Sequence, residues 1–388
     1  MNIRIIPGPL EGTVTPPPSK SQAHRAILAQ LLAGGGTISN LASSEDIEAT
    51  QRCAAALKLA GDGLPLLDCG ESGSTLRFLI PIALALRGGG IFTGHGRLME
   101  RPQQPYFDIF DEKGVSYEQK NGMLTLRGEL KPGEYRLPGN VSSQFVTGLL
   151  YALPLLEGDS QIILTSPLES RGYVDMTLDV LDKFGVRVEV LEDGFAVPGR
   201  QEYRPCDLTV EADWSQAAFW YAAIALGSPV ELEGLNAFST QGDMEIVPCF
   251  LKLQGAGEVE LDVSDWPDLV PPLAVMAALR GGEITRLTNA ARLRMKESDR
   301  LASVTQVLNI LGAQVEEGPD FLKITGRDGL AGGVTVDCHN DHRIAMMAAI
   351  AATRCKEPVT LLGAECVKKS YPNFWDDYRM LGGKLDVL

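Results

Sequence analysis

The eight residues Leu181-Asp-Lys-Phe-Gly185-Val-Arg-Val188 decide the fold class, because they join the end of an amphipathic helix to a strand-like stretch through one glycine. A glycine suits this position, since the residue that follows a helix often takes a left-handed backbone conformation. The pattern occurs at five further glycines, and consecutive members of the whole set lie 53 to 71 residues apart: Gly61, Gly114, Gly255, Gly312 and Gly382. These intervals are too long for a solenoid and predict six units of about 55–70 residues, each rich in helix and strand.

The order of elements within a unit follows from the segments after two of these glycines. Residues Val186–Val190 and Gln314–Glu316 have the pattern of a strand, and each is followed by a turn and a second strand. A unit therefore reads helix, strand, turn, strand, which predicts an α+β fold with mixed sheets. Six units divide evenly into two domains of three, with a seam near Val210-Glu-Ala-Asp213, where a strand leads into a helix. The first dozen residues could pair with either half.

Composition and charge narrow the function classes. The chain of 388 residues is 45% apolar and 22% charged, which is typical of a globular protein with two or three domains. Its 35 basic and 50 acidic residues give a formal charge of −15, and such a surface repels nucleic-acid backbones and anionic membranes. We therefore expect neither partner, and we expect any anionic ligand to be held by basic residues gathered locally.

The cysteines and the N-terminal residues bear on the compartment. The seven cysteines are scattered without a Cys-x-x-Cys pair, which favours reduced thiols over a disulfide framework or a zinc site. The first residues, Met1–Gly8, lack the charged and apolar regions of a signal peptide. No apolar run approaches the ~18 residues that a membrane-spanning helix needs. We expect a cytoplasmic protein that holds no metal.

Basic residues stand at several predicted helix starts, where the helix dipole disfavours a cation unless an anion is bound there too. In Pro16–Arg25 a serine can cap a helix whose first two turns carry Lys20 and Arg25. In Asn340–Arg343 an asparagine or aspartate can cap a helix whose first turn carries Arg343. Gly70–Arg77 and Gly139–Phe145 add starts rich in small and hydroxyl residues, whose backbone N–H groups can cradle an anion. Each motif alone could be an ordinary capped turn or a solvated helix face, but together they favour a ligand with several anionic groups.

The densest charged stretch is Arg292–Leu301. On a helix, Lys296 and Arg300 would share a face with a glutamate beside it, and a carboxylate between two cations stays ionised and can relay a proton. A solvated helix face laced with ion pairs would have the same sequence pattern. Two other residues are open to both interpretations: Asp268 could simply cap the helix that follows it, and Lys369 ends a strand-like segment, where a lysine is usually mere surface.

In their order along the chain, these motifs closely resemble the EPSP synthase family of enolpyruvyl transferases. The resemblance spans essentially the whole chain and is carried by six motifs: Pro18-Ser-Lys20-Ser21 with Arg25, Ser72-Gly73-Ser74, Glu100-Arg101-Pro102, Ser142-Ser143-Gln144, Lys296-Glu297-Ser298-Asp299-Arg300 and Asn340-Asp341-His342-Arg343. It implies two similar domains, each of three βαβαββ units, which agrees with the six repeats. The first domain would be residues 18–213, and residues 1–17 plus 214–388 would form the second.

The resemblance implies a reaction of the shikimate pathway, which leads to chorismate and the aromatic amino acids. The enolpyruvyl group of phosphoenolpyruvate would move to the 5-hydroxyl of shikimate 3-phosphate by addition and elimination, with release of phosphate and without a cofactor. Both substrates are small anions, and we expect the chain to act as a monomer. The motifs suit this chemistry, because arginines bind carboxylates and phosphates in a bidentate manner.

The same resemblance assigns roles to residues. Shikimate 3-phosphate would be bound by residues from both halves of the chain: Lys20, Ser21, Arg25, Ser142, Ser143, Gln144, Ser170, Asp268 and Lys296. Phosphoenolpyruvate would be bound by a second, overlapping set: Lys20, Gly73, Arg101, Gln144, Arg300, Arg343 and Lys369. Asp268 would accept the hydroxyl proton, Glu297 would exchange a proton with the enolpyruvyl methylene, and Lys20 would complete the catalytic set. Neither half alone would hold a complete site.

Two alternatives remain open. UDP-N-acetylglucosamine enolpyruvyltransferase shares the fold, but it would be expected to carry a cysteine in the loop near Arg101, and Leu98–Gln104 has none. An RNA-end-processing relative could be built from similar units, but the acidic balance and the cluster Lys296–Arg300 count against it.

Overall fold

Four sheets of the same construction hold most of the strands in the computed structural model, which describes all 388 residues. In each sheet two strands that are joined through a helix run parallel, and two antiparallel pairings complete the four-stranded order. Contacts divide the chain into two units. We call Ser19–Val210 the continuous unit and Met1–Pro18 with Glu211–Leu388 the split unit.

The continuous unit holds two of these sheets, with strand orders β4-β5-β7-β6 and β10-β11-β9-β8. A short parallel pair, β3 with β12, joins its first and last segments. Its helices are α1 (Lys20–Ala33), α2 (Glu45–Leu59), α3 (Gly73–Arg87), α4 (Gln104–Lys113), α5 (Ser143–Ala152) and α6 (Arg171–Lys183), with 3-10 turns η1 (Leu98–Glu100) and η2 (Leu153–Leu155). Its strands are β3 (Ile38–Ser39), β4 (Leu66–Asp68), β5 (Gly89–Thr93), β6 (Ser116–Lys120), β7 (Met123–Arg127), β8 (Gly133–Leu137), β9 (Ser160–Leu164), β10 (Glu189–Leu191), β11 (Gly194–Val197) and β12 (Leu208–Thr209).

The split unit holds the other two sheets, β14-β15-β17-β16 and β19-β21-β1-β22, and two parallel pairs, β2 with β13 and β18 with β20. Its helices are α7 (Trp214–Ala225), α8 (Ile246–Gln254), α9 (Val270–Ala278), α10 (Arg300–Leu311), α11 (His342–Ala352) and α12 (Phe374–Met380), with 3-10 turns η3 (Gly242–Glu245), η4 (Pro267–Leu269), η5 (Ala291–Met295) and η6 (Ala364–Lys369). Its strands are β1 (Ile3–Ile6), β2 (Gly12–Val14), β13 (Val230–Leu232), β14 (Val259–Asp262), β15 (Ile284–Thr288), β16 (Gln314–Glu317), β17 (Leu322–Thr325), β18 (Leu330–Gly332), β19 (Thr335–Asp337), β20 (Cys355–Glu357), β21 (Val359–Leu362) and β22 (Lys384–Val387).

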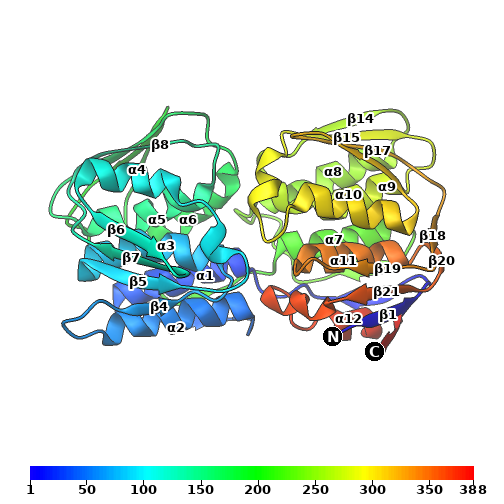
Figure 1. Ribbon diagram of the computed structural model, residues 1–388, viewed down its shortest axis with the longest axis horizontal. Coiled ribbons are helices and arrows are strands. Elements are labelled where there is room, and N and C mark those ends of the chain that lie inside the picture. Colours follow the sequence, from blue (N-terminus) through cyan, green and yellow to red (C-terminus); the bar gives the residue numbers. More distant parts are fainter. The chain divides into compact units, whose positions relative to one another are not determined.

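The N-terminal strand β1 completes the last sheet of the split unit. It lies between β21 and β22 and is antiparallel to both, with Ile3 opposite Leu361 on one side and Val387 on the other. Ile3 and Ile5 are buried while the residues next to them are exposed, which is the alternation of a strand with one face on a core. The two chain ends therefore lie side by side (Figure 1).

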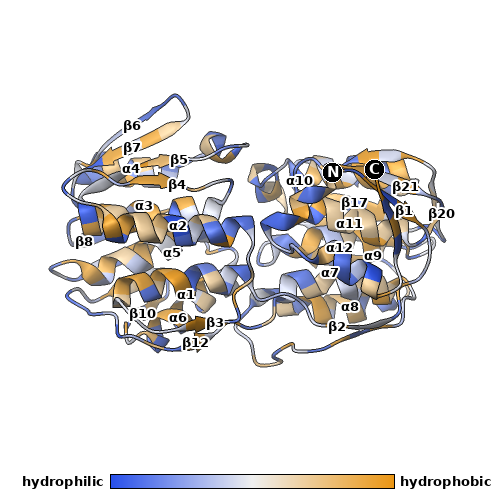
Figure 2. Ribbon diagram, turned by 90° about the horizontal axis from the view of Figure 1, so that it is seen from below, coloured by the Kyte–Doolittle hydropathy of each residue, from blue (hydrophilic) through white to orange (hydrophobic).

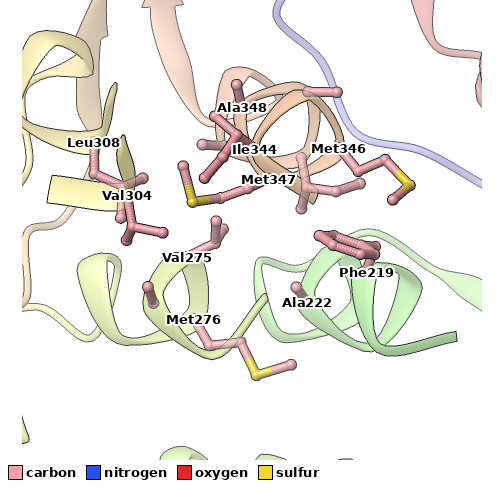
Figure 3. Packing of buried hydrophobic residues seen from close by; sticks show 14 of the residues in the cluster. Phe219, Ala222, Val275, Met276, Val304, Leu308, Ile344, Met346, Met347 and Ala348 are labelled. Atoms are coloured by element: carbon pink, nitrogen blue, oxygen red, sulfur yellow. The ribbon is translucent and has the colours of Figure 1, made fainter. Parts of the chain in front are cut away.

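Each unit has its own hydrophobic core, built mainly from helices. In the split unit, Figure 3 shows Ile344 and Met347 of α11 facing Val275 of α9 and Val304 of α10. Every residue of α11 is buried, so its first turn is shielded from water as well. In contrast, α2 mixes hydrophilic and hydrophobic residues along its length, as its colouring in Figure 2 shows. A helix that is apolar all round belongs in a core. The helix α11 lies in one, yet its buried first turn carries the polar residues His342 and Arg343.

The predicted α+β class is confirmed, and the repeated glycines take the expected left-handed conformation at four of the six positions. Positive φ angles occur at Gly114, Gly185, Gly312 and Gly382. The prediction is wrong at Gly255, which has an extended conformation with φ −75°, and at Gly61, which lacks a positive φ. In these two repeats the chain leaves the helix in an extended conformation, at Ala60 and at Gly255. The order of helix and strand is kept there, although the glycine is not left-handed.

Candidate active site

The first turn of α1 holds two predicted ligands of the continuous unit, Lys20 and Ser21. Ser19 caps the helix by accepting a hydrogen bond from the N–H of Gln22. The Lys20 ammonium pairs with the carboxylate of Asp46 at 2.7 Å. The helix therefore starts where the sequence predicts, and its lysine already has one anionic partner.

The buried guanidinium of Arg25 has only neutral partners. It donates to the hydroxyl of Thr177 at 2.8 Å, to the Ser21 carbonyl at 2.7 Å and to the Tyr173 carbonyl at 2.8 Å. It also lies over the ring of Phe78, 5.2 Å from its centroid. Burial lowers the pKa of Arg25 to about 10, which still leaves it protonated at neutral pH. The chain thus buries a positive charge without placing a carboxylate beside it.

The start of α3 is covered by a second such cation, Arg101. Ser72 caps α3 by accepting from the N–H of Thr75, and Gly73 is the first helical residue. A Cβ placed on Gly73 would lie only 2.5 Å from a guanidinium nitrogen of Arg101, so only a glycine lets the guanidinium lie this close. The Arg101 side chain is 9% exposed and makes no hydrogen bond or ion pair within the chain, and its Nε is buried. A helix N-terminus and an unpaired buried cation together call for an anion.

The starts of α5 and α6 hold the remaining predicted residues of this unit. Ser142 caps α5 by accepting from the N–H of Gln144, and Ser143 is buried in the first turn. The Gln144 amide donates to the hydroxyl of Ser74 at 2.9 Å, which links α5 to the start of α3. Ser170 is buried at the start of α6 in a left-handed conformation, with φ 58°. Four helix starts of one unit thus hold the residues that the sequence singled out there.

In the split unit the predicted residues meet around the carboxylate of Asp268, which lies in η4. One oxygen accepts from Arg300 at 2.9 Å, and the other accepts from Arg343 at 2.9 Å. The ammonium of Lys296 lies 3.5 Å away. Three cations from three segments therefore share one carboxylate.

One guanidinium, that of Arg300, joins this carboxylate to two others. It is 1% exposed and meets three acids: Asp268 at 2.9 Å, Glu297 at 2.6 Å and Asp341 at 3.0 Å. Asp341 also caps α11 by accepting from the N–H of Arg343 at 3.0 Å. Three cations and three carboxylates make this network formally neutral.

The network shifts the protonation of its members. Burial lowers the pKa of Lys296 to about 8, although the carboxylate of Asp268 opposes the shift. Burial also disfavours the charge on Arg300, but the neighbouring carboxylates of Asp341, Glu297 and Asp268 outweigh it and raise its pKa. Arg300 is therefore a permanent cation, whereas Lys296 can lose its proton in mildly alkaline solution.

The structure corrects three expectations about local structure. Lys296 and Arg300 do not share a helix face, because η5 ends at Met295, Lys296 is extended, and α10 begins only at Arg300. The side chain of Asp299 is the N-cap of α10, so the helix begins only after it and does not include Lys296. Asp268 caps no helix, because its carboxylate is taken by cations.

Lys369 is the third correction. It ends η6 rather than a strand, it is 3% exposed, and its ammonium donates to the carbonyl of Asn340 at 2.7 Å. This contact brings it to the start of α11, next to the segment that carries Arg343.

Two residues of these clusters were not among the predicted site residues. Asp341 belongs to a motif of the sequence analysis, but its hydrogen bond from Arg300 joins residues that are 41 positions apart in the sequence. Arg77 lies in α3 and donates to the Gln144 side chain at 2.8 Å. The signal that could have found it is an arginine one turn into a helix, directly before a run from Phe78 to Leu86 that is entirely apolar.

Two general features complete the description. No helix is both long enough and apolar enough to cross a lipid bilayer. No three His, Cys, Asp or Glu side chains are grouped so that they could hold a metal ion.

Two solved structures with this fold are an EPSP synthase and an enolpyruvyl transferase. The EPSP synthase from Acinetobacter baumannii superimposes with a TM-score of 0.80 at 25% sequence identity, covering 99% of both chains. The enolpyruvyl transferase NikO from Streptomyces tendae gives a TM-score of 0.78 at 16% identity over 99% of this chain and 98% of that one, which is a likeness of fold.

Relatives of known name are much closer in sequence. The 3-phosphoshikimate 1-carboxyvinyltransferase of Clostridium kluyveri is 47% identical over 427 residues, covering 99% of this chain and 98% of that protein. The protein of the same name from Clostridioides difficile is 43% identical over 432 residues, with the same coverage. A sequence profile described as EPSP synthase (3-phosphoshikimate 1-carboxyvinyltransferase) matches residues 5–378. With relatives this similar over their full length, the chain belongs to the EPSP synthase family.

Proposed function

We propose that this chain transfers the enolpyruvyl group of phosphoenolpyruvate to the 5-hydroxyl of shikimate 3-phosphate and releases phosphate. Its place in the EPSP synthase family, with named relatives matched from end to end, supports this reaction. The structural observation that carries the proposal is the pair of buried cations, Arg25 and Arg101, that lack a carboxylate partner in the chain. Anionic substrates would supply the missing counter-charge.

Shikimate 3-phosphate is bound, in this proposal, mainly at the helix starts of the continuous unit. Hydroxyls and cations there suit a phosphate on a polyhydroxylated ring. The proposed ligands in that unit are Lys20, Ser21, Arg25, Ser142, Ser143, Gln144 and Ser170. Asp268 and Lys296 of the split unit complete the set.

Phosphoenolpyruvate is bound by cations that surround its carboxylate and its phosphate. The proposed ligands are Lys20, Gly73, Arg101 and Gln144 of the continuous unit and Arg300, Arg343 and Lys369 of the split unit. The close approach of Arg101 to Gly73 supports the part in the continuous unit, because it adds a cation to free N–H groups at a helix start. The proposal requires both units to act on one pair of substrates.

The chemistry needs one base for the hydroxyl and one acid for the methylene. Asp268 takes the 5-hydroxyl proton as the oxygen attacks C2 of phosphoenolpyruvate, and Glu297 delivers a proton to C3, which gives a tetrahedral adduct. The adduct then loses phosphate from C2 while Glu297 takes a proton back from the methyl group, which restores the double bond, and the proton held by Asp268 leaves with the phosphate. Lys20 completes the proposed catalytic set as a cation that stabilises the anionic groups.

The geometry around Arg300 supports this division of roles. Asp268 accepts from Nη1 of the guanidinium and Glu297 accepts from Nη2, so two carboxylates are fixed on adjacent nitrogens of one planar group. One shared cation thus holds the two proposed proton-transfer groups side by side.

We also propose the domain division that the sequence predicts, residues 18–213 and residues 1–17 plus 214–388. The contact-based units, which divide after Pro18 and Val210, support it to within a few residues. A monomer in the cytoplasm, without nucleic-acid partners, is the working state we propose, and the formal charge of −15 supports the last point.

Release of inorganic phosphate from phosphoenolpyruvate tests the proposal. We expect release only when shikimate 3-phosphate is present, and we expect no release with UDP-N-acetylglucosamine as the acceptor. Release that is equal with the nucleotide sugar, or that is independent of any acceptor, would show that the proposed acceptor is wrong.

A further inference from the structure

We propose that Arg77 is a positioning residue, which fixes the side-chain amide of Gln144 so that its N–H groups face the anionic substrates. The inference rests on the proposed role of Gln144 as a substrate ligand. Arg77 belongs to none of the ligand sets described above. It is buried, with 5% of its surface exposed, and it lies one turn after Gly73, the first residue of α3.

Three contacts hold the guanidinium of Arg77 in one place. Its Nη2 donates to the carbonyl of Pro102 at 3.1 Å, and its Nη1 donates to Oε1 of Gln144 at 2.8 Å. Its central carbon lies 4.7 Å from the centroid of the Phe145 ring. A planar group that is held on one side by a carbonyl and on a face by a ring has little freedom to rotate.

The contact with Gln144 decides which way the amide points. A guanidinium only donates hydrogen bonds, so the atom that meets it must be the amide oxygen. The nitrogen of the amide then faces the other way, where one N–H donates to the hydroxyl of Ser74 at 2.9 Å. The second N–H has no acceptor within the chain.

This orientation matters because the proposed substrates are anions. An N–H group attracts a carboxylate or phosphate oxygen, whereas a flipped amide would present its own oxygen and repel it. Without Arg77 both orientations of the Gln144 amide become accessible, and only one of them binds. Arg77 therefore acts on the substrate through Gln144, from a distance of one side chain.

Replacement of Arg77 by methionine or lysine is the first arm of the test. Met removes both donors, and we expect kcat/KM for phosphoenolpyruvate to fall about 10- to 100-fold, which corresponds to a hydrogen bond from a charged group. Lys keeps the charge but reaches only one acceptor at a time, so we expect a smaller loss. Arg87→Met is the matched control, because Arg87 ends the same helix and donates to the carbonyls of Leu57 and Lys58. It should leave kcat/KM within about twofold of the wild type, since the lost contacts join α3 to the end of α2 and do not involve Gln144.

The decisive arm is a double-mutant cycle in Gln144→Ala. If Arg77 works through Gln144, then Arg77→Met or Arg77→Lys should cost little further kcat/KM once the amide is gone. The melting temperature of every variant is measured as well, because a purely structural role would lower stability without this non-additivity. A full 10- to 100-fold loss from Arg77→Met in the Gln144→Ala background would overturn the inference.

The two proposals fail in different ways. A wild-type protein that shows no acceptor-dependent phosphate release contradicts the proposed function before any variant is made. An active wild type with additive losses leaves the function standing and removes only the role of Arg77. Should Arg77→Met not fold, the lysine variant carries the same cycle.

Discussion

The two units hold their buried cations in opposite ways. In the continuous unit Arg25 meets only hydroxyl and carbonyl oxygens, and the side chain of Arg101 has no partner in the chain. In the split unit Arg300 meets three carboxylates, and Arg343 pairs with Asp268. One unit is left with positive charge that nothing in the protein offsets, while the other is neutralised from within.

This difference separates binding from proton transfer. Burying a cation without a counter-ion is costly, so a site that does so is prepared for an anion that comes from outside. A neutral network of acids and cations has less to offer an anion, but it holds its carboxylates in fixed positions, as general acid–base catalysis needs. In the proposed function, the continuous unit therefore offers cations that are open to a substrate anion, whereas the split unit supplies the acids for proton transfer and cations that an anion must win from those acids.

The largest expected effect comes from the acid in the split unit. Glu297→Gln removes the proposed proton donor but keeps the size of the side chain, so kcat should fall by about 10²- to 10⁴-fold with little change in substrate affinity. Steady-state phosphate release measures both. Glu316→Gln is the control, because Glu316 is an exposed acid whose partner is Lys323. A kcat close to that of the wild type in Glu297→Gln would show that Glu297 is only an ion-pair partner of Arg300 and not the proton donor.

The next effect tests whether Asp268 holds the place of a substrate anion. An anion that reaches Arg300 and Arg343 must compete with this carboxylate, so Asp268→Asn should bind phosphoenolpyruvate about tenfold more tightly. The same variant should lose most of its kcat, because it lacks the carboxylate that we propose as the base. Titration calorimetry measures the affinity, with Asp262→Asn as a control, since that carboxylate bonds to Ser264 and Asn289 instead. Weaker binding in Asp268→Asn would show that the carboxylate organises the arginines rather than competing with the ligand.

A smaller effect follows from the lowered pKa of Lys296. Its ammonium is charged below a pH of about 8 and loses its charge as the pH rises through that value. Because a phosphate needs the charged form, the affinity for shikimate 3-phosphate should fall above pH 8 by at most about tenfold per pH unit. Lys296→Arg should remove this decline, since arginine stays protonated throughout. A decline that persists unchanged in the arginine variant would assign the titration to another group.

Helix starts were predictable from sequence because capping is local. Ser19, Ser72, Ser142 and Asp341 each cap the helix that follows, with a side chain that accepts from an N–H two or three residues later. A pattern of a few residues is enough to place such a start. The predicted residues of the continuous unit lie at starts of this kind or against one, except Ser170, which precedes α6 without a capping hydrogen bond from its side chain.

The network of the split unit was not predictable in the same way. Arg300 reaches Asp268 across 32 residues of sequence, and Arg343 reaches it across 75. Such contacts depend on how α9, α10 and α11 pack, and the helical pattern from Lys296 to Arg300 was misleading because Asp299 is used as a cap. The repeat was visible in sequence, but the loss of the left-handed glycine at Gly255 was not, since either backbone conformation is open to glycine.

The most direct test of the contrast between the units compares the stabilities of Arg101→Met and Arg300→Met in urea, without ligands. The account predicts that Arg300→Met loses about 3–5 kcal/mol of unfolding free energy, because it leaves three carboxylates without their shared cation. Arg101→Met should stay within about 1 kcal/mol of the wild type, because that guanidinium has no partner in the chain to lose. Equal losses in the two variants would contradict the claim that the ligand-free chain pairs the buried cation Arg300 with its own acids and leaves Arg101 unpaired.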